Sequence, residues 1–158
     1  MASVVSHIWK PVRARMIAID GFVPVPRGTT PQPPAPASWP AKDPADILDY
    51  QLNIGPAVLG NEGDYIISVD VDISPSMPGD LSLDNISADG SNVILWLSAG
   101  ISGVTYEVTS KIALSSGRTL QRSVLLPVIS LSSIVIPPNA IQTTTLDPLT
   151  DEFGTPLT

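Results

Sequence analysis

Residues 92–128, NVILWLSAGISGVTYEVTSKIALSSGRTLQRSVLLPV, decide the fold of this 158-residue chain. Large apolar side chains alternate with polar ones along the stretch, and small residues with glycine interrupt the alternation at 99–103 and 115–117. A period of two predicts strands that bury one face, and the interruptions predict tight turns. The strands that we expect here are antiparallel and cover 92–98, 104–114 and 119–128.

The same alternation continues on the N-terminal side of this stretch. It predicts strands at 48–54 and 65–74, and a shorter strand at 81–86 after a turn at 75–80. The side chains expected to face the core are Leu48, Tyr50, Leu52 and Ile54 in the first strand, and Ile67, Val69, Val71 and Ile73 in the second. Asp49, Gln51 and Asn53 are expected to face solvent. Six or seven strands in about ninety residues, with turns every ~8–12 residues, predict an antiparallel β-sandwich.

Two aromatic residues favour the immunoglobulin-like form of this sandwich. Trp96 lies in the middle of a predicted strand, where such a fold places a core tryptophan. Tyr106 opens the next strand just after Gly103, at the position of a tyrosine corner. We therefore predict an all-β chain, a small antiparallel immunoglobulin-like β-sandwich with an extended N-terminal arm and C-terminal tail. The aromatic residues assigned to its structural core are Tyr50, Trp96 and Tyr106.

Composition divides the chain into an arm (1–37), a sandwich (38–128) and a tail (129–158), with net charges of +3, −7 and −3. The arm ends in a proline-rich run that favours an extended spacer. Its short β-branched runs at 3–9 and 16–25 would need a partner sheet to form strands. The tail is rich in threonine and proline and lacks the large side chains that offset ordering entropy. We expect the sandwich to fold without either extension.

The overall composition excludes several classes of function. A net charge of −7 argues against nucleic-acid binding, which needs a basic face. No cysteine is present, which excludes disulfides and thiolate metal sites, and the single histidine, His7, offers little for catalysis. No apolar run is long enough for a signal peptide or a membrane span, so we expect synthesis in the cytoplasm and no membrane contact.

A search for catalytic or metal-binding groups finds no constellation in the sequence. Asp70 and Asp72 share one strand face, and a calcium site is conceivable there, but alternating acids are typical of a solvated strand. The turn at 100–103 joins two strands and is not a nucleophile elbow. We predict a protein that is not an enzyme and that binds no cofactor or metal; a hydrolase would lack a base.

Three motifs go beyond composition: W-P-x-K-D-P-x-x-x-L-D-Y, then W-L-S-x-G-x-x-G-x-x-Y, then G-R-T-x-x-R-S. In this order, over roughly 38–128, the chain resembles the fibre-tail adaptor family of tailed phages. The matching residues are Trp39, Pro40, Lys42, Asp43, Pro44, Leu48, Asp49, Tyr50, Trp96, Leu97, Ser98, Gly100, Gly103, Tyr106, Gly117, Arg118, Thr119 and Arg122.

The resemblance implies a structural virion protein, made in the host cytoplasm, that links a fibre to the tail, neck or baseplate. Its partners would be other virion proteins, and it would be a homo-oligomer that matches the symmetry of the particle. We expect the arm to add a strand to a neighbour's sheet and its charge to steer it to acidic surfaces, including an adjacent copy. The candidate partner-binding residues are Trp9, Arg13, Arg15, Phe22 and Trp39.

Two points stay open at this stage. Asp49 is a candidate ion-pair partner for Arg118 or Arg122, but alternation alone cannot bring them together. The alternative function is a carbohydrate- or surface-binding module, because small sandwiches often carry sugar sites. Exposed aromatic residues would favour that alternative, and only eight aromatic residues occur in the chain.

Overall fold

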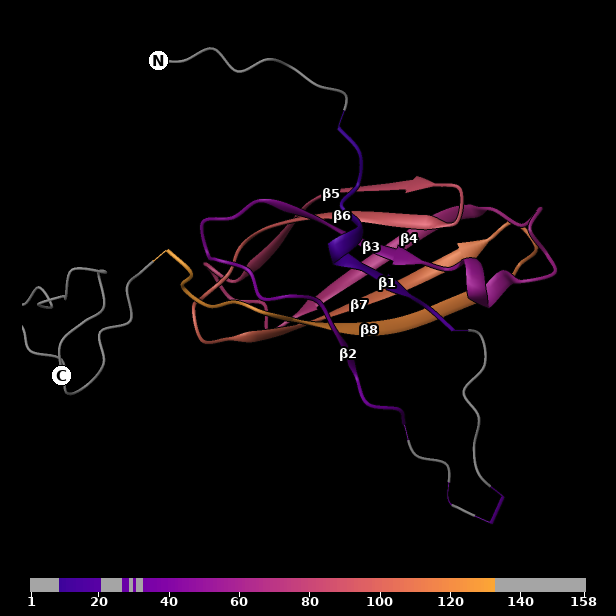
Figure 1. The fold of residues 1–158 in the computed structure, drawn as a ribbon, viewed down its shortest axis with the longest axis horizontal. Coiled ribbons are helices and arrows are strands. Elements are labelled where there is room, and N and C mark those ends of the chain that lie inside the picture. The colour runs from indigo at the N-terminus through magenta and orange to yellow at the C-terminus, as the bar shows by residue number, and fades with distance from the viewer. Residues whose placement is uncertain (1–8, 21–26, 29, 31–32, 133–158) are drawn as a thin grey trace, which may run out of the picture.

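The computed structural model describes residues 9–20, 27–28, 30 and 33–132, which form two facing four-stranded sheets (Figure 1). Sheet A has the order β1-β3-β6-β5, with β1 Met16–Ala18, β3 Leu48–Asn53, β6 Asn92–Ala99 and β5 Leu81–Asp89. Sheet B has the order β2-β8-β7-β4, with β2 Ala37–Ser38, β8 Thr119–Pro127, β7 Thr105–Leu114 and β4 Ile66–Ser74. Two short 3-10 turns complete the elements, η1 Arg13–Arg15 and η2 Gly55–Val58.

The predicted all-β, immunoglobulin-like sandwich is confirmed. The six strands expected between residues 48 and 128 all form, and they pair antiparallel with one another. Their inward side chains meet between the sheets in one apolar core. Its fully buried members include Tyr50, Leu52, Leu95 and Leu97 from sheet A, and Tyr106, Val108, Ile112 and Leu126 from sheet B.

Bulges in two strands alter which side chains face inward. In β4 the pairing with β7 shifts between Ile66 and Ser68, so Ile67 points outward and is 60 % exposed. The expectation that Ile67 faces the core is therefore wrong, and Ile66 packs there instead. In β5 a similar shift between Leu83 and Asn85 breaks the alternation. The strand continues to Asp89, beyond the end predicted near 86.

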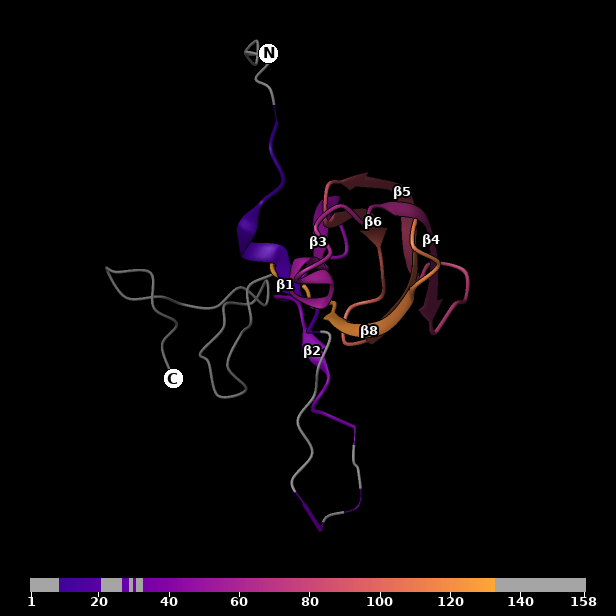
Figure 2. The same ribbon diagram turned by 90° about the vertical axis from the view of Figure 1, so that its right-hand side faces the viewer.

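The sheets are mixed because the arm contributes a short parallel strand to each. β1 pairs parallel with β3, and β2 pairs parallel with β8. The partner sheet that the run at 16–25 was expected to need thus belongs to the same chain. Next to β1, Ile19 donates its N–H to Asn53 O at 2.7 Å and buries its side chain in the core. Figure 2 shows β1 and β2 on one side of the sandwich and β4 on the opposite side.

Candidate functional site

The arm is fastened to the outer side of sheet A through Asp49. Its carboxylate accepts a hydrogen bond from Val12 N–H at 2.8 Å and forms an ion pair with Arg15 Nη2 at 2.5 Å. Arg15 Nε also donates to the carbonyl of Asp49. Beside them, Gln51 Nε2 donates to the Val12 carbonyl at 2.9 Å. Asp49 and Gln51, expected to face solvent, are therefore buried, because the arm covers this side of β3.

The electrostatics of Asp49 follow from this contact. Burial pushes its pKa upward, but the hydrogen bonds from Val12 and Arg15 prevail and hold the pKa below its ordinary value. Neither pairing considered from the sequence occurs in the structure. Arg118 pairs with Asp64 at 3.1 Å, and Arg122 donates to the carbonyls of Gln121 and Asp20. Arg15 is thus a fastening residue of the arm.

Trp96 packs against the arm and lies outside the core. Val93, Leu95 and Leu97 take the inward positions of β6, so the indole of Trp96 lies on the outer side of sheet A and is only half-buried. The ring of Trp9 meets it edge-on, with centroids 5.5 Å apart and an interplanar angle of 76°. The assignment of Trp96 to the structural core is therefore wrong. The run Val93–Leu97 is apolar throughout, so alternation could not show which face it buries.

Around this contact the arm presents an exposed surface that we call the arm patch, comprising Trp9, Lys10, Val12, Arg13 and Met16. Trp9 is 57 % exposed, and Val12 and Met16 are exposed as well. Lys10 and Arg13 are exposed, and neither has a carboxylate partner among the described residues. Tryptophan, methionine and arginine are the residue types enriched where proteins bind one another.

Trp39 and Phe22, the other two partner-binding candidates, are not part of this patch. Trp39 is 2 % exposed and packs on Tyr50 in the core, with ring centroids 5.1 Å apart. It therefore cannot contact a partner while the sandwich is folded, because its place beside β2 turns its indole inward. Phe22 lies outside the described residues, as does His7.

Lys42 holds the turn between β6 and β7 from inside. Its fully buried ammonium group donates to the carbonyl of Ala99 at 2.7 Å and to that of Asp43 at 2.8 Å. Ala99 has a φ of 57°, a conformation that a residue with a side chain adopts only when neighbours hold it there. Burial lowers the pKa of Lys42, although the negative charges of Asp46 and Asp43 act to raise it.

Asp43 fixes the start of the tail. One carboxylate oxygen accepts hydrogen bonds from Leu131 N–H at 2.7 Å and from the N–H and hydroxyl of Ser132 at 3.0 and 2.9 Å. The other oxygen accepts from Ala45 N–H at 2.9 Å. The bonds from Ala45, Leu131 and Ser132 lower the pKa of Asp43 to about 2. The exit of the tail from the sandwich is therefore set by a charged residue of the W-P-x-K-D motif.

Tyr106 forms the predicted tyrosine corner. Its hydroxyl accepts a hydrogen bond from Ile101 N–H at 2.9 Å and donates to Asp80 Oδ1 at 2.6 Å. Burial and the bond to Asp80 raise the pKa of Tyr106. The residue joins the turn that follows β6 to the loop that precedes β5, as the fold requires.

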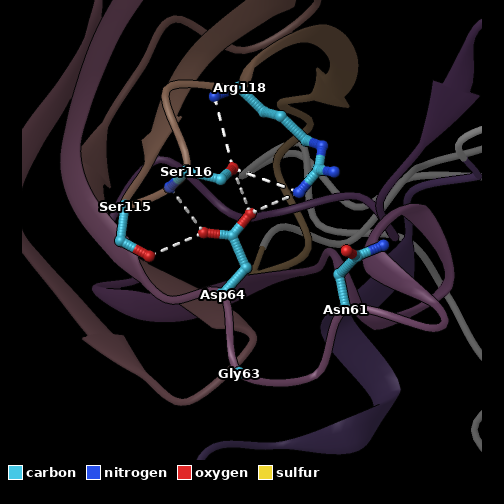
Figure 3. Close-up of a pocket in the computed structure, with 6 residues that line it drawn as sticks. All are labelled: Asn61, Gly63, Asp64, Ser115, Ser116 and Arg118. Carbon is cyan, nitrogen blue, oxygen red and sulfur yellow. Dashed lines mark hydrogen bonds and ion pairs between the residues drawn. The ribbon is translucent and has the colours of Figure 1, made fainter.

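Asp64 organises the depression shown in Figure 3, in which Ser115, Ser116 and Arg118 converge on its carboxylate. It accepts from Ser115 Oγ at 2.7 Å, Ser116 N–H at 2.9 Å and Arg118 Nη1 at 3.1 Å. The hydrogen bonds from the hydroxyl groups of Ser116 and Ser115 are the main reason that the pKa of Asp64 lies well below its ordinary range. These contacts hold the β7–β8 hairpin turn against the loop that precedes β4. The described ranges contain no group of three potential metal ligands, here or elsewhere.

The family of this chain follows from a match to a protein-family model. The profile described as podophage GP4 fiber-tail adaptor protein gp77 matches residues 42–127. This chain belongs to the podophage fibre-tail adaptor family. The match begins at Lys42 and ends at Pro127, so it includes β3 to β8. The arm patch and the two parallel strands of this fibre-tail adaptor lie outside it.

Other comparisons add little to the family assignment. No curated protein matches the sequence. Among solved structures, the adaptor is similar to the solution structure of the PKD domain from KIAA 1837 protein, with 16 % identity and a TM-score of 0.34; the match covers 70 % of this chain and 100 % of that one. Within the described segments, no helix is long and apolar enough to span a membrane.

Proposed function

We propose that this protein is a non-enzymatic structural component of a phage particle that joins a fibre to the tail through protein contacts. The family match over residues 42–127 carries the proposal. The contact is made with other virion proteins, so the protein resides in the virion after synthesis in the host cytoplasm. Whether the attachment point lies at the tail, neck or baseplate depends on the partner that its surfaces bind.

The arm patch is the surface that we assign to partner binding. Trp9 and Arg13 support this assignment, since both are exposed and their chemistry suits a protein interface. Arg15 acts indirectly, because its ion pair with Asp49 places η1 and hence the patch. We assign the tail as a second contact, and the hydrogen bonds from Leu131 and Ser132 to Asp43 fix the position of its start.

The environment of the carboxylates supports a structural role. Three aspartates with lowered pKa values each fasten a different part of the chain, since Asp43 holds the tail, Asp49 holds the arm and Asp64 holds a hairpin turn. Their oxygens are occupied by backbone and side-chain donors of this chain. A catalytic acid or base needs a pKa near the working pH, and these groups are shifted in the opposite direction.

A binding experiment tests the proposal. The purified full chain is mixed with fibre and tail proteins from the same particle, and complexes are isolated by size-exclusion chromatography. The variants Trp9→Ala and Arg13→Glu should lose at least one of these complexes. The controls Leu59→Ala and Arg27→Glu change exposed residues outside the patch and should bind as the wild type does. Failure of the wild type to bind either protein contradicts the proposal.

The carbohydrate-binding alternative is tested on the same residues. Trp9 and Tyr65 are exposed aromatic residues of the kind that sugar platforms use. A glycan array on which the wild type binds and Trp9→Ala does not would favour this alternative. A blank array together with a fibre or tail complex would favour the adaptor.

A further inference from the structure

We propose that the arm patch of one copy docks on the β4 side of the next copy, so that copies of this chain associate head to tail. This inference rests on the proposed function, because it names a partner for the patch assigned there. The receiving area, which we call the β4 surface, comprises Tyr65, Ile67, Asp70, Asp72 and Glu107.

The β4 surface is an open sheet edge with apolar side chains at one end. β4 is nine residues long and pairs with β7 on one side, while no described strand pairs with its other side. Tyr65, just before β4, and Ile67, near its start, are 62 % and 60 % exposed. Open edges are ready to accept another chain, and exposed apolar side chains on them mark interaction sites. They match the apolar part of the arm patch, Trp9 and Met16.

Charge distinguishes the two surfaces. Asp70, Asp72 and Glu107 lie exposed on β4 and β7, where Lys111 is the one base of the two strands, which leaves a net charge of −2. The arm patch carries Lys10 and Arg13 and no acid, a charge of +2. Opposite charges across an interface favour encounter and fix its orientation. A symmetric contact of patch with patch, or of β4 surface with β4 surface, would instead bring like charges together.

The two surfaces lie on opposite sides of the sandwich. η1, which contributes Arg13 to the patch, lies on one side of the sandwich, and β4 lies on the opposite side (Figure 2). A contact between different surfaces on opposite sides is heterologous, and the assembly then retains one free surface of each kind, one at either end. Repeating such a contact builds a ring when the rotation closes, which suits attachment around the axis of a phage tail.

A charge-swap experiment tests the head-to-tail contact. Variant X carries Lys10→Glu and Arg13→Glu, so its patch and its β4 surface are both negative. Variant Y carries Asp70→Lys and Asp72→Lys, so both of its surfaces are positive. Sedimentation velocity over a concentration series should show that the wild type self-associates and that X or Y alone does so roughly tenfold more weakly. The equimolar mixture of X and Y should recover association, because each patch then meets an oppositely charged β4 surface.

The outcomes separate this inference from the proposed function. A wild type that stays monomeric up to millimolar concentration overturns the head-to-tail contact, as does a mixture of X and Y that associates no better than its components. If the wild type still forms a complex with a fibre or tail protein, the proposed function stands. If that protein shields β4 from hydrogen exchange while copies fail to associate, the β4 surface receives the other protein instead. Unchanged melting temperatures of X and Y verify that both variants are folded.

Discussion

The guanidinium group of Arg15 lies 2.5 Å from a carboxylate oxygen of Asp49, although 34 positions separate the two residues in the chain. Both side chains are largely shielded from water, with 18 % and 7 % exposure. This pair fixes the 3-10 turn that contains Arg13 and that follows Trp9 in the chain. The fold of the sandwich and the position of its proposed binding surface are thus connected by one ion pair.

Arg15→Ala should lower the free energy of unfolding by about 2–3 kcal/mol, because it leaves the Asp49 carboxylate shielded from water without its cation. Denaturant unfolding measures the change. Arg13→Ala is the matched control, since Arg13 belongs to the same turn but is exposed, and it should stay within ~0.5 kcal/mol of the wild type. Equal effects of the two variants would show that the arm does not pack on Asp49.

Ile19→Ala should lower the free energy of unfolding by about 2–4 kcal/mol, because it leaves a cavity in the core. Met16→Ala, on the exposed side of β1, should cost less than ~1 kcal/mol. For the same reason we expect deletion of 1–20 to lower the melting temperature. An unchanged melting temperature of the deleted chain would instead support a domain that begins at residue 38.

Three tyrosine-to-phenylalanine variants should separate paired from unpaired hydroxyl groups. Tyr106→Phe removes a donor from Asp80 and an acceptor from Ile101, and should cost about 1–2 kcal/mol. The Tyr50 hydroxyl is buried without a partner among the described residues, and burial raises its pKa to about 12. Tyr50→Phe should therefore be neutral or stabilising. Tyr65→Phe changes an exposed residue and is the control. If Tyr50→Phe lowered the free energy of unfolding as much as Tyr106→Phe does, the Tyr50 hydroxyl would have a partner and the prediction would be wrong.

Acid should release the start of the tail. The pKa of Asp43 is about 2 in the folded chain and ~3.9 in an unfolded one, so its bonds stabilise the tail above pH ~4 and are lost as the pH falls through about 2. Hydrogen exchange, corrected for its intrinsic pH dependence, should show the amides of Leu131 and Ser132 losing protection in that window. In Asp43→Asn they should be less protected at neutral pH too. The amide of Gly103, bonded to the Val128 carbonyl, is the internal control and should change in neither case.

Periodicity is sufficient to predict the strands but not every face. Alternation locates the six main strands and the inward direction of Tyr50, because each of these strands packs on one core. It fails at Ile67, where a bulge inserts one residue, and at Trp96, where apolar residues occupy both faces. Such positions depend on the neighbouring strand, which the local sequence does not specify.

The candidate site is harder to predict, since it depends on contacts between distant segments. The sequence groups Trp9, Arg13 and Arg15 as basic and aromatic residues of one arm, yet only the structure separates Arg15, which fastens the arm, from the other two. Trp39 resembles a contact residue because it follows the proline-rich run, but β2 turns it inward onto Tyr50. The burial of Asp49 and Gln51 on the expected solvent face reveals the arm contact, and it arises only when the arm is in place.

The parallel pairing of β2 with β8 has a mechanical consequence. The segment after β1 enters β2 at its start and the tail leaves after the end of β8, so tension between that segment and the tail pulls the two strands in opposite directions along their length. The bonds that share this load are Trp39 N–H to Leu125 O, Lys42 N–H to Pro127 O and Ile129 N–H to Lys42 O. They are stretched together in shear and do not peel apart singly. A force transmitted through the chain therefore meets the sheet in its most resistant direction.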